Sequence, residues 1–139
     1  MALVEVGIRE LSKRFPKVLS PQTHALVDYG VAGAFFLGAR LLWGSSRRAA
    51  IASLACGAAE TAIILLTDYP GGVAKVISFA KHGRLDAAMS GTVAMLPMLL
   101  GFRDRKKSAL FRAQAVGIAV TAGMTDFEAA GAGRRRRAA

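Results

Sequence analysis

The sequence contains two copies of one pattern, offset by 58 residues, and this repeat limits the possible folds more than any other feature. Residues 15–72 align with residues 73–130 without a gap. The matched residues are often polar and individually rare, and their order is the same in both copies, which is typical of a duplicated supersecondary unit. The pairs used below are His24 with His82, Asp28 with Asp86, Thr67 with Thr125, and Asp68 with Asp126. We therefore predict one domain over 1–130, built by tandem duplication.

Each copy contains two long segments with almost no charge. No charged residue lies within 29–39, 87–102 or 113–125, and the segment 49–67 carries only Glu60. Such segments have the length and composition of membrane-crossing helices, whereas a soluble bundle would carry charge regularly on its exposed faces. We therefore predict an all-α fold, an integral membrane four-helix bundle made of two helical hairpins. The expected helices are Pro21–Trp43, Ala49–Thr67, Leu85–Phe102 and Leu110–Asp126.

An amphipathic segment leads into each hairpin, and we expect both segments to form helices that lie on the membrane surface. In the first copy, apolar residues occur at helical spacing and charged residues take the opposite face; the second copy is Val73–Ala80. Packing on a protein partner is the alternative for these helices.

Residues 131–139 contain four consecutive arginines, from which we expect a disordered basic tail. With a formal net charge of +10, anionic lipid head groups are the expected partner, and nothing else in the chain supports nucleic-acid binding. The apolar residues of the first segment are Leu3, Val4, Ile8, Leu11 and Phe15.

The repeated histidines and aspartates are candidate site residues. Each histidine precedes an aspartate by four residues, so the two side chains share one face of a helix. Asp68 and Asp126 follow at helix C-termini, where the helix dipole disfavours an anion unless a cation is near. We therefore predict two His–Asp clamps on one membrane face, each joining a histidine to an aspartate of the antiparallel neighbour, with Asp28 or Asp86 as a second acceptor. The clamps would tie the hairpin ends or bind the two halves together. The residues of this polar site are His24, Asp28, Asp68, His82, Asp86 and Asp126.

Three alternatives for these ionisable residues stay open. Two histidines and up to four carboxylates near a two-fold axis could bind divalent zinc, manganese or iron. Two histidines that face each other could also ligate haem b from both sides. Glu60 lies in mid-helix, where Ile118 replaces it in the second copy. It could serve proton or cation movement, or form a hydrogen bond to a neighbouring helix as a protonated acid.

Other sequence features mainly exclude functions. The chain has no phosphate-binding glycine loop, nucleophile elbow or specific metal motif, so we do not expect an enzyme. The single cysteine, Cys56, cannot form an intramolecular disulfide. Acidic residues near the start, such as Glu5, do not fit a cleavable signal peptide. Eight basic residues flank the hairpin loops and eleven lie on the other side, which favours cytoplasmic termini only slightly.

The segment "LDAAMSGTVAMLPMLLGF", Leu85–Phe102, resembles a helix of the small bacterial membrane proteins named for the SPW repeat. There a glycine is followed by apolar residues, a proline and an ending like Leu100-Gly101-Phe102. The resemblance covers one helix of each unit and the two-hairpin plan, and Leu96-Pro97-Met98 stands in the place of Ser-Pro-Trp. It implies a compact, duplicated four-helix membrane protein. That family brings no established chemistry and supplies no site residues.

Together these features predict a small, non-catalytic, multi-pass protein of the bacterial inner membrane. We expect a structural or accessory subunit without a cofactor, which packs against membrane protein partners or against copies of itself. The alternative is a metal- or haem-binding redox component, or a proton or cation transport component, that uses the repeated histidines and aspartates.

Overall fold

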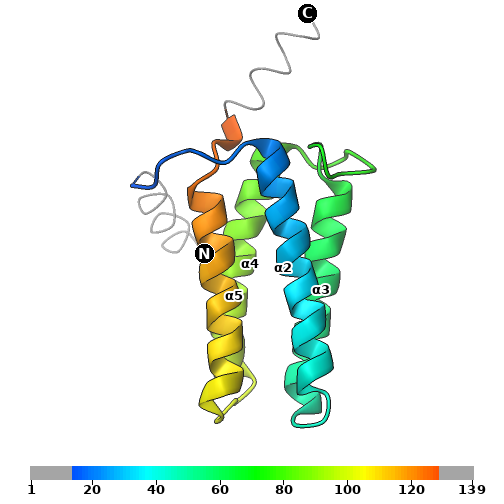
Figure 1. The fold of residues 1–139 in the computed structure, drawn as a ribbon, viewed down its shortest axis with the longest axis vertical. Coiled ribbons are helices and arrows are strands. Elements are labelled where there is room, and N and C mark those ends of the chain that lie inside the picture. The colour runs from blue at the N-terminus through cyan, green and yellow to red at the C-terminus, as the bar shows by residue number, and fades with distance from the viewer. Residues whose placement is uncertain (1–13, 129–139) are drawn as a thin grey trace, which may run out of the picture.

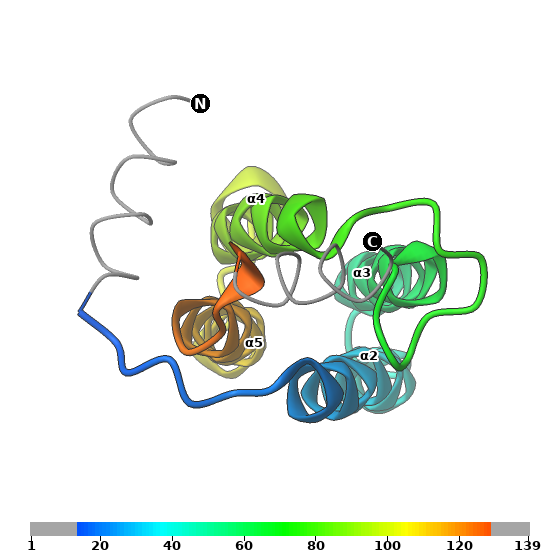
Figure 2. The ribbon, with the colours of Figure 1, turned by 90° about the horizontal axis from the view of Figure 1, so that it is seen from above.

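The computed structural model describes residues 14–128, and these residues form four helices and no strand. Two antiparallel hairpins stand side by side, with both hairpin loops at one end of the bundle (Figure 1). Seen along the bundle, α2 pairs with α3 and α4 pairs with α5 (Figure 2). The all-α fold is therefore confirmed for these residues, whereas the predicted basic tail and most of the first amphipathic segment lie outside them. The helices are α2 (Pro21–Leu42), α3 (Arg47–Leu66), α4 (Phe79–Leu99) and α5 (Arg105–Gly123).

A side-chain cap fixes the start of each helix. Ser20, Ser46 and Ser78 each accept a hydrogen bond from the backbone N–H three residues further on, at 3.2–3.3 Å. Asp104 caps α5, and the backbone N–H groups of Lys107 and the preceding residue lower the pKa of its carboxyl. These caps supply acceptors for N–H groups that have no partner within a helix.

The caps also correct three predicted helix starts. In the structure α3 begins at 47 instead of 49, α4 at 79 instead of 85, and α5 at 105 instead of 110. The sequence prediction excluded the charged residues at these positions because it required apolar segments. A capped first turn tolerates charge, since its side chains can point outward at the end of the bundle. At the other end, α4 stops two residues after Pro97, and Gly101 follows with a positive φ of 65°.

The predicted second surface helix, Val73–Ala80, is wrong. Residues 73–78 form an irregular, non-helical strap in which Lys75 has a positive φ of 53°, and α4 starts only at Phe79. The physical reason is the end of α3, whose last carbonyls need hydrogen-bond donors. The backbone N–H groups of Val73 and Ala74 donate to the Leu65 carbonyl. Those of residues 76 and 77 donate to the carbonyl of residue 66, and all four distances are 2.8–2.9 Å. The strap therefore satisfies groups that a helix over the same residues would leave unpaired.

Residues 15–20 are the equivalent strap of the first copy, and the two straps connect the hairpins with the same 58-residue offset as the sequence. The Leu19 N–H donates to the Met124 carbonyl at 3.0 Å, and the Ile77 N–H donates to the Leu66 carbonyl at 2.9 Å. Each contact joins the strap of one copy to the last helical turn of the other copy. These contacts tie the hairpins together at the end opposite their loops.

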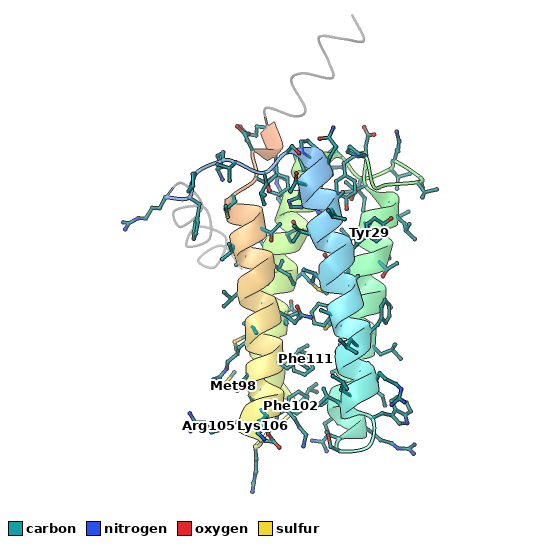
Figure 3. All side chains as sticks on the ribbon, viewed as in Figure 1. Tyr29, Met98, Phe102, Arg105, Lys106 and Phe111 are labelled. Atoms are coloured by element: carbon teal, nitrogen blue, oxygen red, sulfur yellow. The ribbon has the colours of Figure 1, made fainter. Side chains whose placement is uncertain are left out.

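Inside each hairpin, one buried serine bonds across the helix pair. Ser53 Oγ donates to the Phe35 carbonyl at 2.7 Å, and Ser90 Oγ donates to the Ala115 carbonyl at 2.8 Å. Apolar side chains fill the bundle towards the loop end, where Phe111 points inward (Figure 3). The small side chains of this core let the helices approach closely.

Two of the helices, α2 and α3, are long and apolar enough to cross a membrane, judged by length and composition. About a third of the apolar window is buried in each, 33% in α2 and 39% in α3. The sequence predicted four helices of this kind, and two of the four described helices have the required length and composition. Charged residues enter the first turns of α4 and α5, as in the segments Lys81–Asp86 and Arg105–Lys107.

Candidate metal centre

Two histidines and two aspartates meet in the bundle just below the two straps. His24 and Asp28 come from α2, and His82 and Asp86 come from the equivalent positions of α4. Both histidines are 0% exposed, and the aspartates are 4% and 2% exposed. Helical spacing of four residues places each pair on one face, and the pseudo-symmetric arrangement of the hairpins brings the two faces together.

The distances among these four side chains define a compact polyhedron. His24 Nε2 lies 3.1 Å from His82 Nε2, 3.3 Å from Asp28 Oδ2 and 3.3 Å from Asp86 Oδ2. His82 Nε2 lies 3.1 Å from Asp28 Oδ2 and 3.2 Å from Asp86 Oδ1. One ligand-type atom from each residue lies within 4.8 Å of all the others. The four groups therefore form one cluster instead of two clamps.

Two threonines determine which histidine nitrogen carries a proton. Thr67 Oγ1 donates its hydrogen to the Ile63 carbonyl, and Thr125 Oγ1 donates to the Thr121 carbonyl, at 2.7 and 2.8 Å. A hydroxyl has one hydrogen, so each threonine can only accept from the histidine that contacts it. Those contacts are Thr125 Oγ1 to Nδ1 of His24 and Thr67 Oγ1 to Nδ1 of His82, both 2.8 Å.

The protonated Nδ1 atoms leave both Nε2 atoms facing the centre. In neutral imidazoles these Nε2 atoms are acceptors, and the surrounding carboxylate oxygens are acceptors as well. Asp86 Oδ1 is buried, and it receives no hydrogen bond despite lying 3.2 Å from His82 Nε2. With both imidazoles neutral, the acceptors of the centre outnumber its donors: the Tyr69 hydroxyl donates to Asp28 Oδ2, and a cation would satisfy the remaining lone pairs.

The cluster has the size of a metal coordination shell. Zinc binds imidazole nitrogen and carboxylate oxygen at about 2.0–2.2 Å, so a tetrahedral site has ligand-to-ligand edges of about 3.3–3.6 Å. The separations that include a histidine Nε2 are 3.1–3.3 Å, close to this range, and all four ligand atoms lie within 4.8 Å of one another. The residues could therefore hold a metal ion, as one of the sequence alternatives proposed. The donor set of two imidazoles and two carboxylates suits zinc, iron or manganese.

Haem b, the other cofactor considered from the sequence, does not fit this geometry. Two axial histidines of a haem lie on opposite sides of a flat macrocycle, with the iron between them. Here the Nε2 atoms of His24 and His82 are 3.1 Å apart, and the two carboxylates occupy the space beside them. A porphyrin ring cannot enter between the histidines without separating the hairpins.

One difference between the copies makes the centre asymmetric. The Tyr69 hydroxyl donates to Asp28 Oδ2 at 2.9 Å. Burial, together with the neighbouring Asp28 charge, raises the pKa of this hydroxyl far above its usual range, so it stays a donor. The equivalent of Tyr69 in the second copy is Phe127, which has no hydroxyl to offer Asp86. Asp28 is therefore supported by an outer hydrogen bond that Asp86 lacks.

Removing the Tyr69 hydroxyl is expected to weaken metal binding. In Tyr69→Phe, Asp28 loses the hydrogen bond that orients it, and loss of such an outer partner typically costs 10–100-fold in affinity. Competition with a chromogenic zinc chelator measures the affinity. The matched variant Phe127→Tyr adds a hydroxyl at the equivalent position and is expected to bind at least as tightly as the original chain. Equal affinity of Tyr69→Phe and the original chain would show that this hydrogen bond does not support the centre.

Aromatic rings shield the histidines. His24 makes edge contacts with Phe79 and Phe127, with ring centroids 5.4 and 5.2 Å apart, and Tyr69 lies 5.1 Å from the His82 ring. These rings keep the four polar groups out of water, which strengthens any electrostatic interaction at the centre.

The sequence prediction of the site needs one correction and one addition. Neither Asp68 nor Asp126 belongs to the four-residue cluster; Asp68 is half-buried and Asp126 is exposed. Thr67 and Thr125, which are adjacent to these aspartates in the sequence, contact the histidines. The identity of these threonines in both copies is the signal in the sequence that points to them, but a neutral side chain gives no charge-based reason to pair with a histidine.

Glu60 lies near the centre but outside the cluster. Its side chain is 1% exposed, and Oε2 has no hydrogen-bond partner. It interacts electrostatically with Asp86, Asp28 and His82. The prediction of a proton or cation role for Glu60 stays a prediction.

Glu60→Ile is expected to keep the metal and the fold. The second copy already has Ile118 at this position, so the side chain is compatible with the bundle, and removing an unpartnered buried oxygen removes a desolvation cost. Elemental analysis and thermal unfolding test this, with Glu60→Gln as the variant of similar shape. Loss of the metal in both variants would instead make Glu60 part of the centre.

No protein-family model, curated protein or solved structure matches this chain. The roles of these residues therefore depend on their geometry, and the resemblance to SPW-repeat membrane proteins stays a prediction.

Proposed function

We propose that this chain is a small integral membrane protein whose two hairpins are joined by a buried divalent transition metal. The ligands are His24, Asp28, His82 and Asp86. The observation that carries this proposal is the pair of threonine contacts, because they direct both Nε2 lone pairs to a centre that already contains two carboxylates.

The charges and hydrogen bonds favour a metal over simple clamps. Without a cation, two carboxylates share a buried site, which costs several kcal/mol per unpaired charge. A proton between the two imidazoles would satisfy their mutual contact but would leave the carboxylate contacts without enough donors. Protonating both imidazoles would place two N–H groups opposite each other at 3.1 Å. One divalent ion satisfies all four ligands and balances the two aspartates.

The helix surfaces support a membrane location. Large apolar side chains are exposed along the helices, among them Leu26 at 73%, Leu41 at 70% and Met98 at 68%. Many large apolar side chains exposed on the helices favour an apolar cover, and lipid is the simplest cover for α2 and α3, which have the length of membrane spans. The less apolar α4 and α5 would then complete the bundle, with their charged first turns at its ends.

The closed ligand set points to a structural role for the metal. All four protein ligands are almost fully buried, as is usual in structural sites, whereas catalytic sites keep an open coordination position. The ion would fix the strap end of the bundle, where the two copies meet. A rigid end of this kind suits the accessory role expected from the sequence, in which exposed helix faces pack on membrane partners.

Two experiments test the proposal separately. Carbonate extraction of membranes tests the location, and the chain is expected to stay in the pellet. Isothermal titration of chelator-treated protein with zinc tests the centre, with an expected stoichiometry of one ion per chain. Release by carbonate would refute the membrane location, and absence of saturable binding would refute the metal centre.

A further inference from the structure

An apolar groove runs between the two hairpins, along α3 and α4. It has a volume of about 510 Å³ and opens on the outside of the bundle. Small side chains such as Ala52, Ala55 and Ala59 form its α3 side. The α4 side and one end are formed by Met89, Leu96, Leu100 and Arg48.

The charge at one end of the groove indicates what occupies it. Arg48 lies there, and its Nη1 donates to the Leu100 carbonyl at 2.9 Å, which holds the guanidinium at the mouth. The surrounding loop end is strongly basic: residues 40–48 and 100–112 contain eight basic residues and one acidic residue. Arg105 and Lys106 extend from this end of α5 (Figure 3). A groove that is apolar along its length and cationic at its mouth complements an acyl chain with an anionic head group.

The length of the groove matches one leaflet of a bilayer. The α3 residues that line it extend from Arg48 to Ala59, which is about 16 Å along a helix. Half of a bilayer hydrocarbon core is about 15 Å. A single acyl chain with its head group at Arg48 therefore matches both the length of the groove and the charge at its mouth.

We propose that this groove binds an anionic phospholipid, with its phosphate at Arg48 and one acyl chain between α3 and α4. The inference depends on the membrane location proposed above and is independent of the metal centre, which lies at the opposite end of the bundle. The guanidinium has five N–H donors in a planar fork, so it can bond a phosphate while keeping its contact with the Leu100 carbonyl.

Native mass spectrometry of the protein, released from detergent after incubation with equal amounts of phosphatidylglycerol and phosphatidylcholine, tests the proposal. The original chain is expected to retain one phosphatidylglycerol with at least fivefold preference. Arg48→Gln is expected to lose this preference. The matched control Arg47→Gln removes the same charge one residue away, from a side chain that stacks on Trp43 instead of lining the groove, and it is expected to keep the preference.

Filling the groove provides a second test. Ala55→Phe is expected to abolish retention of both lipids while circular dichroism shows unchanged helix content. Equal retention by the original chain and Arg48→Gln would overturn the proposal. So would a dimer that Ala55→Phe dissociates, because the groove would then be an interface between copies. A chain that fails carbonate extraction would refute the membrane location itself, whereas a membrane-bound chain without retained lipid would refute only the lipid site.

Discussion

Replacing either histidine of the cluster by alanine is expected to reduce the bound metal from one ion per chain to less than about a tenth. His24→Ala or His82→Ala removes one of two nitrogen ligands and leaves the threonine that contacts it without its donor. The remaining nitrogen and two carboxylates form an incomplete set for a transition metal in a buried site. Elemental analysis of each purified variant measures the loss.

Two control variants separate this effect from general damage. Cys56→Ser changes a buried residue of the core that does not belong to the cluster, and it is expected to keep the full metal content. Asp126→Asn changes an aspartate that the sequence placed in the site but the structure leaves outside the cluster, and it is expected to keep the metal too. Metal loss in Asp126→Asn, with retention in His24→Ala, would contradict the assignment of the ligands.

Removing the metal with a chelator is expected to lower the melting temperature of the bundle by about 10 °C or more. Without the ion, the carboxylates of Asp28 and Asp86 stay buried, 4% and 2% exposed, and have no full counter-charge. Breaking a buried charge pairing typically costs about 3–5 kcal/mol, and 1 kcal/mol shifts the melting temperature of a chain of this size by about 3–4 °C. Thermal unfolding followed by circular dichroism in detergent measures the shift.

The histidine variants supply the matching control for chelation. His82→Ala is expected to be metal-free already, so the chelator should leave its melting temperature unchanged. Adding zinc back should restore the original chain and leave the variant unaffected. If complete removal of the metal left the melting temperature of the original chain unchanged, the ion would not join the hairpins.

The sequence predicted the architecture and the central residues of the site because both depend on local patterns. Charge-free segments predicted the four helices, and the spacing of four between His24 and Asp28 predicted a shared face. The repeat then implied that His82 and Asp86 form an equivalent face. These inferences need no knowledge of which residues touch across the bundle.

The rest depends on contacts between residues that are distant in sequence. Whether the two histidine faces form separate clamps or one cluster depends on how the hairpins pack, which no local pattern specifies. The helix dipole argument paired each histidine with an aspartate at the end of an antiparallel helix, and it did not predict that Thr125, whose hydroxyl is buried beside Nδ1, contacts His24. The strap Val73–Ser78 looked helical by periodicity, yet the open carbonyls of α3 bind its backbone. Burial and hydrogen-bond demand override local periodicity at these positions.

Elemental analysis of the chain purified in detergent without added metal is the most direct measurement of the proposed centre. We expect close to one zinc, iron or manganese ion per chain in the original protein, and almost none in the variant that carries both His24→Ala and His82→Ala. A folded original chain that contains less than about a tenth of an ion, and that binds none on titration, would contradict the metal centre. The four residues would then form a hydrogen-bonded cluster without a metal.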